Sequence, residues 1–316
     1  MKKFGIILFS LIILIGGFAP SSLAATTNCD QVKGQTKVWW DGIELKPGQI
    51  GRLIIKKDTS LFKLDGNKRI HSRTLKAGEF YRIYAFKPGL LSVGGGYYVE
   101  RDTKITYQTP SKKKLDQVKL IQTCSIVKNS RVTFQLNDSN GVDYNVYIVG
   151  TNEKRAYGSY YTNSWNFAWA GVAEGDLLYK GNYKIYLQKD GSTVISDTGI
   201  KFNDYIYNYS REMIYEIPSY YSGQPDLFAI ANTESSNYES AHLYYVSNGK
   251  LFRVKDQYED WPASITYTTR PTSVGPLTFE TTDYNNAEGI WYTNTWSFNP
   301  NNATFEVIDT TEEYVW

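Results

Sequence analysis

The chain reads Tyr183-Lys184-Ile185-Tyr186-Leu187 directly after Gly181-Asn182. Side chains at alternate positions of a strand point to opposite faces, so Tyr183, Ile185 and Leu187 would share one face. Segments 132–136 and 145–149 upstream also have strand-like composition and are set off by turn signals. Together these segments predict an immunoglobulin-like β-sandwich that spans residues 128–203.

The β character extends through the rest of the chain. Aromatic residues make up 16% of it, with 27 Tyr and 8 Trp, and β-branched and aromatic residues favour strands. Dipeptides typical of hairpin turns recur between the apolar runs: Asp41-Gly42, Asp65-Gly66, Asn140-Gly141, Gly181-Asn182, Asp190-Gly191 and Asn248-Gly249. Segments 226–230, 242–246 and 304–308 predict a further β unit over residues 204–316. The best helix candidate is the short segment 112–121, so the fold class expected is all-β.

One heptapeptide has an echo further along the chain. Residues 161–167 read Tyr-Thr-Asn-Ser-Trp-Asn-Phe, and residues 292–298 read Tyr-Thr-Asn-Thr-Trp-Ser-Phe. Two readings stay open, a duplicated unit and a coincidence of common β-type composition.

The N-terminus has the composition of a secretory signal. Lys2 and Lys3 precede an uncharged apolar stretch, 4–18, that is short for a membrane span. Small residues follow, so we expect cleavage after Ala24 or Ala25 and a signal peptide of residues 1–24. The alternative is an uncleaved membrane anchor. The residues before Cys29 do not fit lipoprotein processing, and the C-terminal residues carry no sorting motif. We therefore expect a secreted protein, or one held non-covalently at the cell wall, without a transmembrane anchor.

The two cysteines, Cys29 and Cys124, both follow the predicted cleavage site. An even cysteine count in an exported chain favours a disulfide, and two buried thiols are the alternative. The pair brackets a first domain, expected at residues 25–127.

Charge is distributed very unevenly along the chain. Residues 25–130 hold 20 Lys plus Arg against 9 Asp plus Glu, and residues 131–316 hold 12 against 23. A basic exported domain attracts polyanions such as teichoic acids, acidic lipids or extracellular DNA; the alternative is that the two parts attract each other. The candidate polyanion contacts are cations beside predicted turns and strand ends, together with a lysine run: Lys56, Lys57, Lys68, Arg69, Arg73, Lys112, Lys113 and Lys114.

A family resemblance lies within this basic region. Segment 75–84, Leu-Lys-Ala-Gly-Glu-Phe-Tyr-Arg-Ile-Tyr, resembles the Leu-Lys-x-Gly-Glu strand of bacterial SH3-like domains, and Gly96-Tyr97-Tyr98-Val99 resembles the strand that follows it. Segment 56–63 would be the preceding strand. The resemblance implies a small β-barrel of a kind that attaches exported proteins to cell wall. The family's Asn-Val-Arg element and its closing Gly-Trp are absent, so no ligand residue is transferred.

Catalytic patterns are largely missing. The chain has two histidines, His71 and His242, and contains neither His-Glu-x-x-His nor Gly-x-Ser-x-Gly. Ser240 and His242 would merely share a strand face, and segment 138–143, which faintly resembles a calcium loop, reads better as a hairpin turn. No catalytic residue, metal ligand or cofactor is assigned.

The expected function is that of a non-catalytic, envelope-associated binding protein. Its ligand is a cell-wall polyanion or a polysaccharide, bound in part through exposed rings; a protein partner is also open, and nucleic acid is disfavoured. The alternative is a secreted hydrolase with a glycosidase-like carboxylate pair, acting on cell-wall or extracellular polysaccharide.

Overall fold

The computed structural model describes residues 29–235, 238–256 and 265–314. Within these residues the chain forms twenty-four strands, one α-helix and one short 3-10 helix, which confirms the all-β fold class. The predicted signal peptide, residues 1–24, lies outside the described residues. No helix of the described part is long and apolar enough to cross a membrane.

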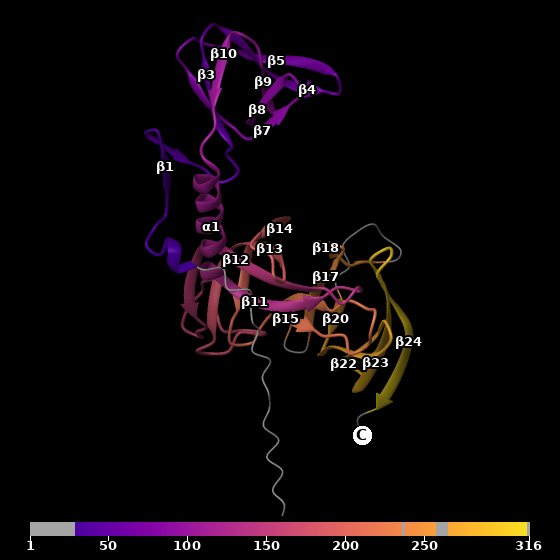
Figure 1. Ribbon diagram of the computed structural model, residues 1–316. Coiled ribbons are helices and arrows are strands. Elements are labelled where there is room, and N and C mark those ends of the chain that lie inside the picture. Colours follow the sequence, from indigo (N-terminus) through magenta and orange to yellow (C-terminus); the bar gives the residue numbers. More distant parts are fainter. Residues whose placement is uncertain (1–28, 236–237, 257–264, 315–316) are drawn as a thin grey trace, which may run out of the picture.

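The N-terminal module consists of two small antiparallel sheets above the rest of the molecule (Figure 1). The first has the order β10 (Ile105–Gln108), β3 (Gly51–Ile55), β6 (Phe80–Ile83). The second has the order β5 (Lys68–Leu75), β4 (Thr59–Asp65), β9 (Tyr97–Glu100), β8 (Leu90–Gly94), β7 (Ala85–Lys87). Both sheets contribute to one buried core, made of Leu53, Ile55, Leu61, Leu75, Ile83, Leu91, Val99 and Ile105. The SH3-like resemblance of this module stays a prediction.

Helix α1 (Lys112–Asn129) connects the module to the rest of the molecule (Figure 1). Ser111 caps it by accepting a hydrogen bond from the Lys114 backbone N–H. The helix is longer than the expected 112–121. The β1 (Val38–Trp40) and β2 (Ile43–Leu45) hairpin packs on its first half, where Trp40 and Val118 belong to one small separate cluster.

The predicted disulfide is present. Cys124 of α1 is bonded to Cys29 at the start of the 3-10 helix η1 (Cys29–Val32), with 5.7 Å between the two Cα atoms. The bond joins the first described residue to the helix that follows the module, so it closes a loop around the whole module.

The first sheet of the body is a four-stranded meander. Its order is β11 (Ser130–Asn137), β12 (Asp143–Tyr157), β13 (Leu177–Lys189), β14 (Ser196–Asn208). The predicted turns at Asn140-Gly141 and Asp190-Gly191 lie between these strands, but the one at Gly181-Asn182 was wrong. Gly181 lies inside β13 at a register shift, where a Cβ atom would come within 3.0 Å of Glu153 and the Thr151 carbonyl. A glycine in a strand can mark such a bulge and close approach rather than a turn.

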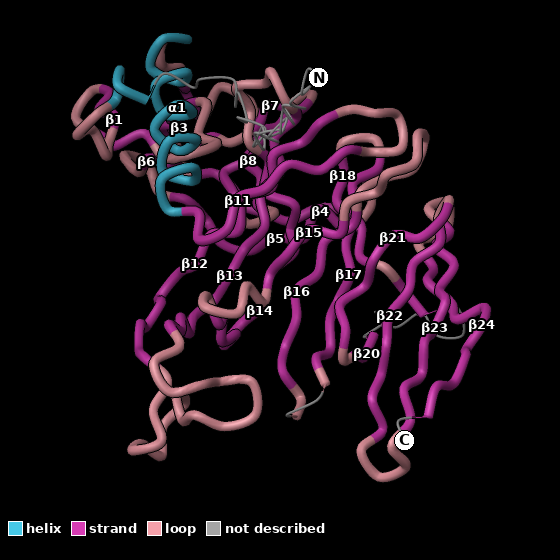
Figure 2. Tube along the Cα trace, turned by 90° about the horizontal axis from the view of Figure 1, so that it is seen from below, coloured by secondary structure: helices cyan, strands magenta, loops and turns pink. Residues whose placement is uncertain are grey.

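Two further sheets complete the body. The middle sheet has the order β15 (Ile214–Ile217), β16 (Leu227–Thr233), β17 (Glu239–Ser247), β18 (Lys250–Arg253), with β20 (Ile265–Tyr267) also pairing with β17. The last has the order β19 (Lys255–Asp256), β24 (Thr304–Tyr314), β23 (Ile290–Asn299), β22 (Thr278–Asn285), β21 (Thr269–Gly275). Figure 2 shows the three sheets in succession across the body.

The middle sheet is buried on both faces, so the body has three layers. Phe228 contacts Phe134 of the first sheet with 5.0 Å between ring centroids, and Tyr245 on the opposite face contacts Phe298 of the last sheet at the same separation. One continuous hydrophobic cluster runs through all three layers. An amphipathic sheet must bury its apolar face against another element, and here that element comes from later in the chain.

The three-layer packing of the body can be compared with the domain limits expected from the sequence. Residues 128–203 supply one sheet, and the sheet packed against it begins at β15, beyond residue 204. Strand β14 runs through the expected 203/204 limit without interruption. The basic region ends where α1 gives way to β11, between Asn129 and Ser130.

The two echoed heptapeptides adopt different structures. Residues 161–167 form turns within the β12–β13 connection, whereas 292–298 lie in strand β23, where Phe298 is buried in the core. The echo does not correspond to a structurally duplicated unit. Two segments of nearly the same composition therefore differ in secondary structure, because their tertiary surroundings differ.

Candidate functional sites

The eight predicted cationic residues all lie on the N-terminal module and α1, but the structure distributes them over three places. Lys56 and Lys57 occupy the β3–β4 turn, Lys68, Arg69 and Arg73 belong to strand β5, and Lys112 to Lys114 form the first turn of α1. Strand β10 runs from the first of these places toward the third. It pairs Ile105 with Ile55, beside Lys56, and Gln108 with Arg52, nearer the helix.

The β3–β4 turn gathers more cations than the sequence predicted. The backbone N–H groups of Lys56 and Lys57 both donate to the Lys104 carbonyl, at 2.8 and 3.1 Å, so Lys104 belongs to the same turn region. Lys76 is also close, because its Nζ lies 2.7 Å from Asp58 Oδ2. Lys56, Lys57 and Lys104 are exposed and have no side-chain hydrogen bond or ion pair within the described residues.

Strand β5 is an edge strand whose side chains are exposed from Lys68 to Thr74. Arg69 is ion-paired with Glu100 and lies over the ring of Phe62. Arg73 donates a hydrogen bond to the Tyr81 hydroxyl at 2.9 Å. Of the three predicted cations on this strand, only Lys68 is left without such a partner among the described residues.

The first turn of α1 places three lysines at the end of a helix where the macrodipole disfavours positive charge. Lys114 Nζ donates to the Trp39 carbonyl at 2.5 Å. Lys112 and Lys113 are exposed, and the described part of the chain offers no acidic partner to either. The three positive charges at the helix N-terminus repel one another and the helix dipole. An anion bound there would relieve this repulsion.

Aromatic rings accompany further cations that the sequence did not single out. Lys63 lies 4.7 Å from the Tyr97 ring centroid, and Lys87 lies 4.6 Å from that of Tyr98. Lys63 and Tyr97 are cross-strand partners on β4 and β9, so the contact depends on strand register. A sequence motif could not have revealed it.

The residues weighed for catalysis have structural partners. Ser240 donates to the Glu234 carboxylate. Asp138 Oδ1 accepts the backbone N–H groups of Asn140 and Val142, at 2.9 and 3.0 Å, so segment 138–143 is a hairpin turn. No group of acidic, His or Cys residues that could hold a metal ion occurs in residues 29–235, 238–256 and 265–314.

One carboxylate pair deserves comparison with a glycosidase site. Glu216 is exposed on β15, but partial desolvation of its carboxylate, and secondarily the Asp226 carboxylate, raise its pKa. Asp226, however, accepts the backbone N–H groups of Ser219 and Asn137, each at 2.7 Å. A carboxylate committed to two backbone donors serves the fold and is poorly suited to act as a nucleophile. The hydrolase alternative gains no support from this pair.

The β12–β13 connection, residues 158–176, forms a site that the sequence reasoning missed. It carries several exposed rings: Tyr160, Tyr161, Phe167 and Trp169, with Tyr157 at the end of β12 beside them. Tyr161 is 94% exposed and Trp169 is 70% exposed. A signal for it was present, because the sequence holds no charged residue from Ala156 to Ala173.

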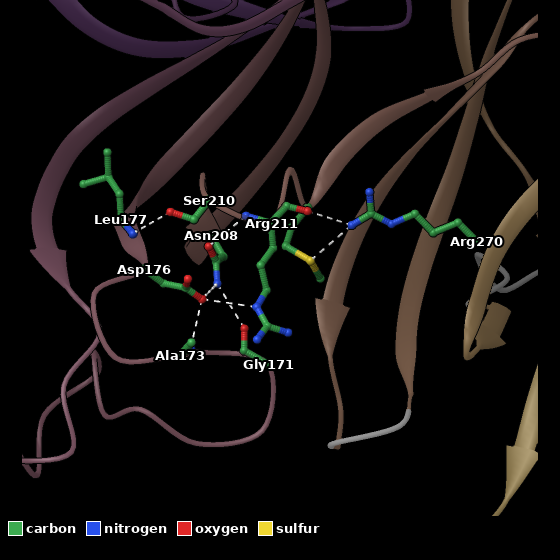
Figure 3. Close-up of polar contacts among 9 residues, drawn as sticks. Gly171, Ala173, Asp176, Leu177, Asn208, Ser210, Arg211 and Arg270 are labelled. Atoms are coloured by element: carbon green, nitrogen blue, oxygen red, sulfur yellow. Dashed lines mark hydrogen bonds and ion pairs between the residues drawn. The ribbon is translucent and has the colours of Figure 1, made fainter.

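A polar network fixes the base of this connection to strand β14 and the residues after it (Figure 3). Asp176 Oδ2 accepts hydrogen bonds from Asn208 Nδ2, the Ala173 backbone N–H and Arg211 Nε, at 2.8, 2.9 and 3.2 Å. Asn208 Nδ2 also donates to the Gly171 carbonyl at 3.0 Å. Burial of Asp176 raises its pKa, but the three donors outweigh that effect and hold the pKa below its ordinary value.

Comparison with known proteins returned no match: no family model, no curated protein and no solved structure is similar to this chain.

Proposed function

We propose that this chain is an exported, non-catalytic binding protein of the cell envelope, and that its basic N-terminal module binds a cell-wall polyanion. The observation that carries the proposal concerns the ion pairs. Among the described residues, each ion pair lies either within 29–129 or within 130–314, and none joins the two parts. The acidic body therefore forms no salt bridge with the basic module among the described residues, which favours an external anion over internal docking.

The cations fit a polymeric ligand better than a small one. They lie at the β3–β4 turn, along the edge strand and at the start of α1, and not around one cavity. An extended polyanion can contact several such places in succession, and long cationic side chains at turns stay solvated while reaching it.

The test uses the secreted chain and isolated cell walls, with teichoic acid as a second probe. Lys56→Glu/Lys57→Glu and Lys112→Glu/Lys113→Glu should each weaken binding at low salt. The wild-type chain should lose binding as salt rises, since the screening length falls from about 10 Å at 0.1 M to about 3 Å at 1 M. Lys154→Glu/Lys250→Glu, which alters two exposed lysines of the body, is the control with the same change in net charge.

Two results would contradict the proposal. One is that the control pair weakens wall binding as much as the module pairs do. The other is that binding at 0.1 M and at 1 M salt is equal. A protein that cleaves wall polysaccharide, and loses that activity on replacement of a single acidic residue, would instead establish the hydrolase alternative.

A further inference from the structure

The connection between β12 and β13 differs chemically from the three cationic places of the basic module and α1. From Ala156 to Ala173 the chain contains neither acid nor base, and the carboxylate of Glu174, which follows, accepts the backbone N–H of Tyr160 at 2.6 Å. Its most exposed rings, Tyr161 and Trp169, have no aromatic or cationic partner within the described residues. The residues between the rings, 162–164 and Asn166, carry only hydroxyl or amide side chains.

The connection is held in one conformation by bonds along its length. Its two ends are joined where the Gly158 N–H donates to the Asp176 carbonyl at 2.8 Å and the Gly175 N–H donates to the Gly158 carbonyl at 2.9 Å. Further out, the Ser159 N–H donates to the Asn166 carbonyl at 3.0 Å, and the Ala168 N–H donates to the Ser159 carbonyl at 2.9 Å.

Gly171 adds a contact with the middle sheet. It has φ of +88°, and a Cβ atom there would lie 2.2 Å from the Thr233 side chain. Only glycine fits so close an approach with that backbone conformation. Together with the Asp176 network (Figure 3), this contact holds the backbone that carries the exposed rings before any ligand arrives, which lowers the entropic cost of binding.

We infer that this connection is a binding site for an uncharged polysaccharide. The apolar C–H faces of sugar rings can stack on exposed aromatic rings, and the hydroxyls of sugars can exchange hydrogen bonds with the amide and hydroxyl groups of 162–164 and Asn166. A polyanion would find no cation between Ala156 and Ala173.

The other macromolecular ligands fit the same residues less well. Membrane-surface segments combine Trp, Phe or Leu with Lys or Arg on the opposite face, whereas no Lys or Arg lies between Ala156 and Ala173. Protein interfaces draw on Arg as well as on Tyr and Trp. No Arg lies in this stretch, and the adjacent Arg155 is engaged by the ring and hydroxyl of Tyr157. A neutral glycan matches both the rings and the lack of charge.

The experiment measures retention of the secreted chain by neutral polysaccharides at 1 M NaCl, where the polyanion site is screened. The probes are dextran, laminarin, hydroxyethyl cellulose and cell wall stripped of its anionic polymers by hydrofluoric acid. Trp169→Ala and Tyr161→Ala should each reduce affinity for the retained polymer by about tenfold, as expected for one lost stacking contact. Trp39→Ala and Tyr220→Ala are the matched controls, since these rings are 58% and 77% exposed but lie outside the connection.

A chain that binds none of these probes overturns the inference. So does a loss that is equal in the control variants, or ring-dependent binding seen only with phosphatidylglycerol vesicles or with a protein partner. Retention by the neutral polymer should be unchanged in Lys56→Glu/Lys57→Glu. Because that variant tests the basic module alone, the two proposals can fail separately.

Discussion

Removing the disulfide should destabilise the N-terminal module and leave the body unaffected. Cys29 and Cys124 are 95 residues apart, and both belong to the part of the chain that precedes β11. The module has its own core around Leu53 and Leu91, distinct from the cluster that fills the body. The double variant Cys29→Ser/Cys124→Ser removes the crosslink without leaving a reactive thiol.

The expected loss follows from the length of the closed loop. In the chain-entropy description, releasing a crosslink across 95 residues costs about 4.7 kcal/mol at 25 °C. For a small domain with a urea m-value of about 2 kcal/mol/M, that loss lowers the unfolding midpoint by about 2 M. Few single changes in a small module would have so large an effect.

The measurement is urea unfolding followed by pulsed hydrogen exchange, which reports module and body peptides separately. Peptides from β3 and β10 should show the lower midpoint, while peptides from β16 and β17 should keep theirs. Reducing the wild-type chain should reproduce the variant. A shift below about 0.5 M in the module, or an equal shift in the body, would refute the reasoning that the crosslink constrains the module alone.

Three other perturbations test the packing and the titrating groups. Trp40→Ala should destabilise the β1–β2 hairpin and its packing on α1 by about 3–5 kcal/mol in denaturant unfolding, because Trp40 is buried in the cluster that joins them; a loss under 1 kcal/mol would contradict this. Asp176→Asn should remove about 1.5–3 kcal/mol of charged hydrogen bonding and speed hydrogen exchange near Ala173. The pKa of Asp176 is lowered on folding, so the stabilisation by its carboxylate is fully present above the unfolded pKa near 4. In the wild type, the protection factors of amides near Ala173 should therefore fall as pH falls through the folded pKa. Protection factors that stay constant over this range would refute the prediction. Glu216 has the opposite sign: its raised pKa makes ionisation destabilising. Because the residue is exposed and solvent screens its charge, Glu216→Gln should raise Tm at pH 7 only slightly and lose that advantage below about pH 4; a large gain, or a gain that persists at about pH 3, would contradict this.

Much of the fold was predictable because its signals are local. At Asn248-Gly249 both residues have positive φ and join β17 directly to β18, as an Asn-Gly turn should. Gly181-Asn182 gave the same signal and was misread, because a bulge beside Glu153 also selects glycine. What distinguishes the two positions is a neighbouring strand, which the local sequence does not contain.

The layering of the body could not be predicted for a related reason. Segment 226–230 appeared as an ordinary strand, yet from Leu227 to Ala231 every residue of β16 is buried. A strand covered on both faces reads as a continuous apolar run that could equally come from a buried helix. Which sheets cover it is a matter of tertiary packing, so the sequence suggested separate units where the chain builds one core.

The two candidate sites differed in predictability on physical grounds. The cations were visible in the sequence because net charge does not depend on fold, although their division among the β3–β4 turn, β5 and α1 does. The rings of residues 160–169 looked like core material, since most Tyr and Trp residues are expected to be largely buried. Only the structure reveals that the connection turns them outward while Asp176 and Gly171 hold its base.

If the basic module binds a wall polyanion and the β12–β13 connection binds a neutral glycan, as we propose, their placement in different parts of the chain has a consequence for retention. Attraction to a polyanion is long-ranged but screened by salt, whereas stacking on neutral sugar is short-ranged and insensitive to salt. A chain that carries both interactions can be drawn to a charged wall by its module and then held by its body. The second contact would be intramolecular once the first is made, so its effective concentration would be set by the connection through α1 and not by the amount of protein in solution. Two individually weak sites of different chemistry would thereby give retention that neither the basic module nor the aromatic connection could provide alone.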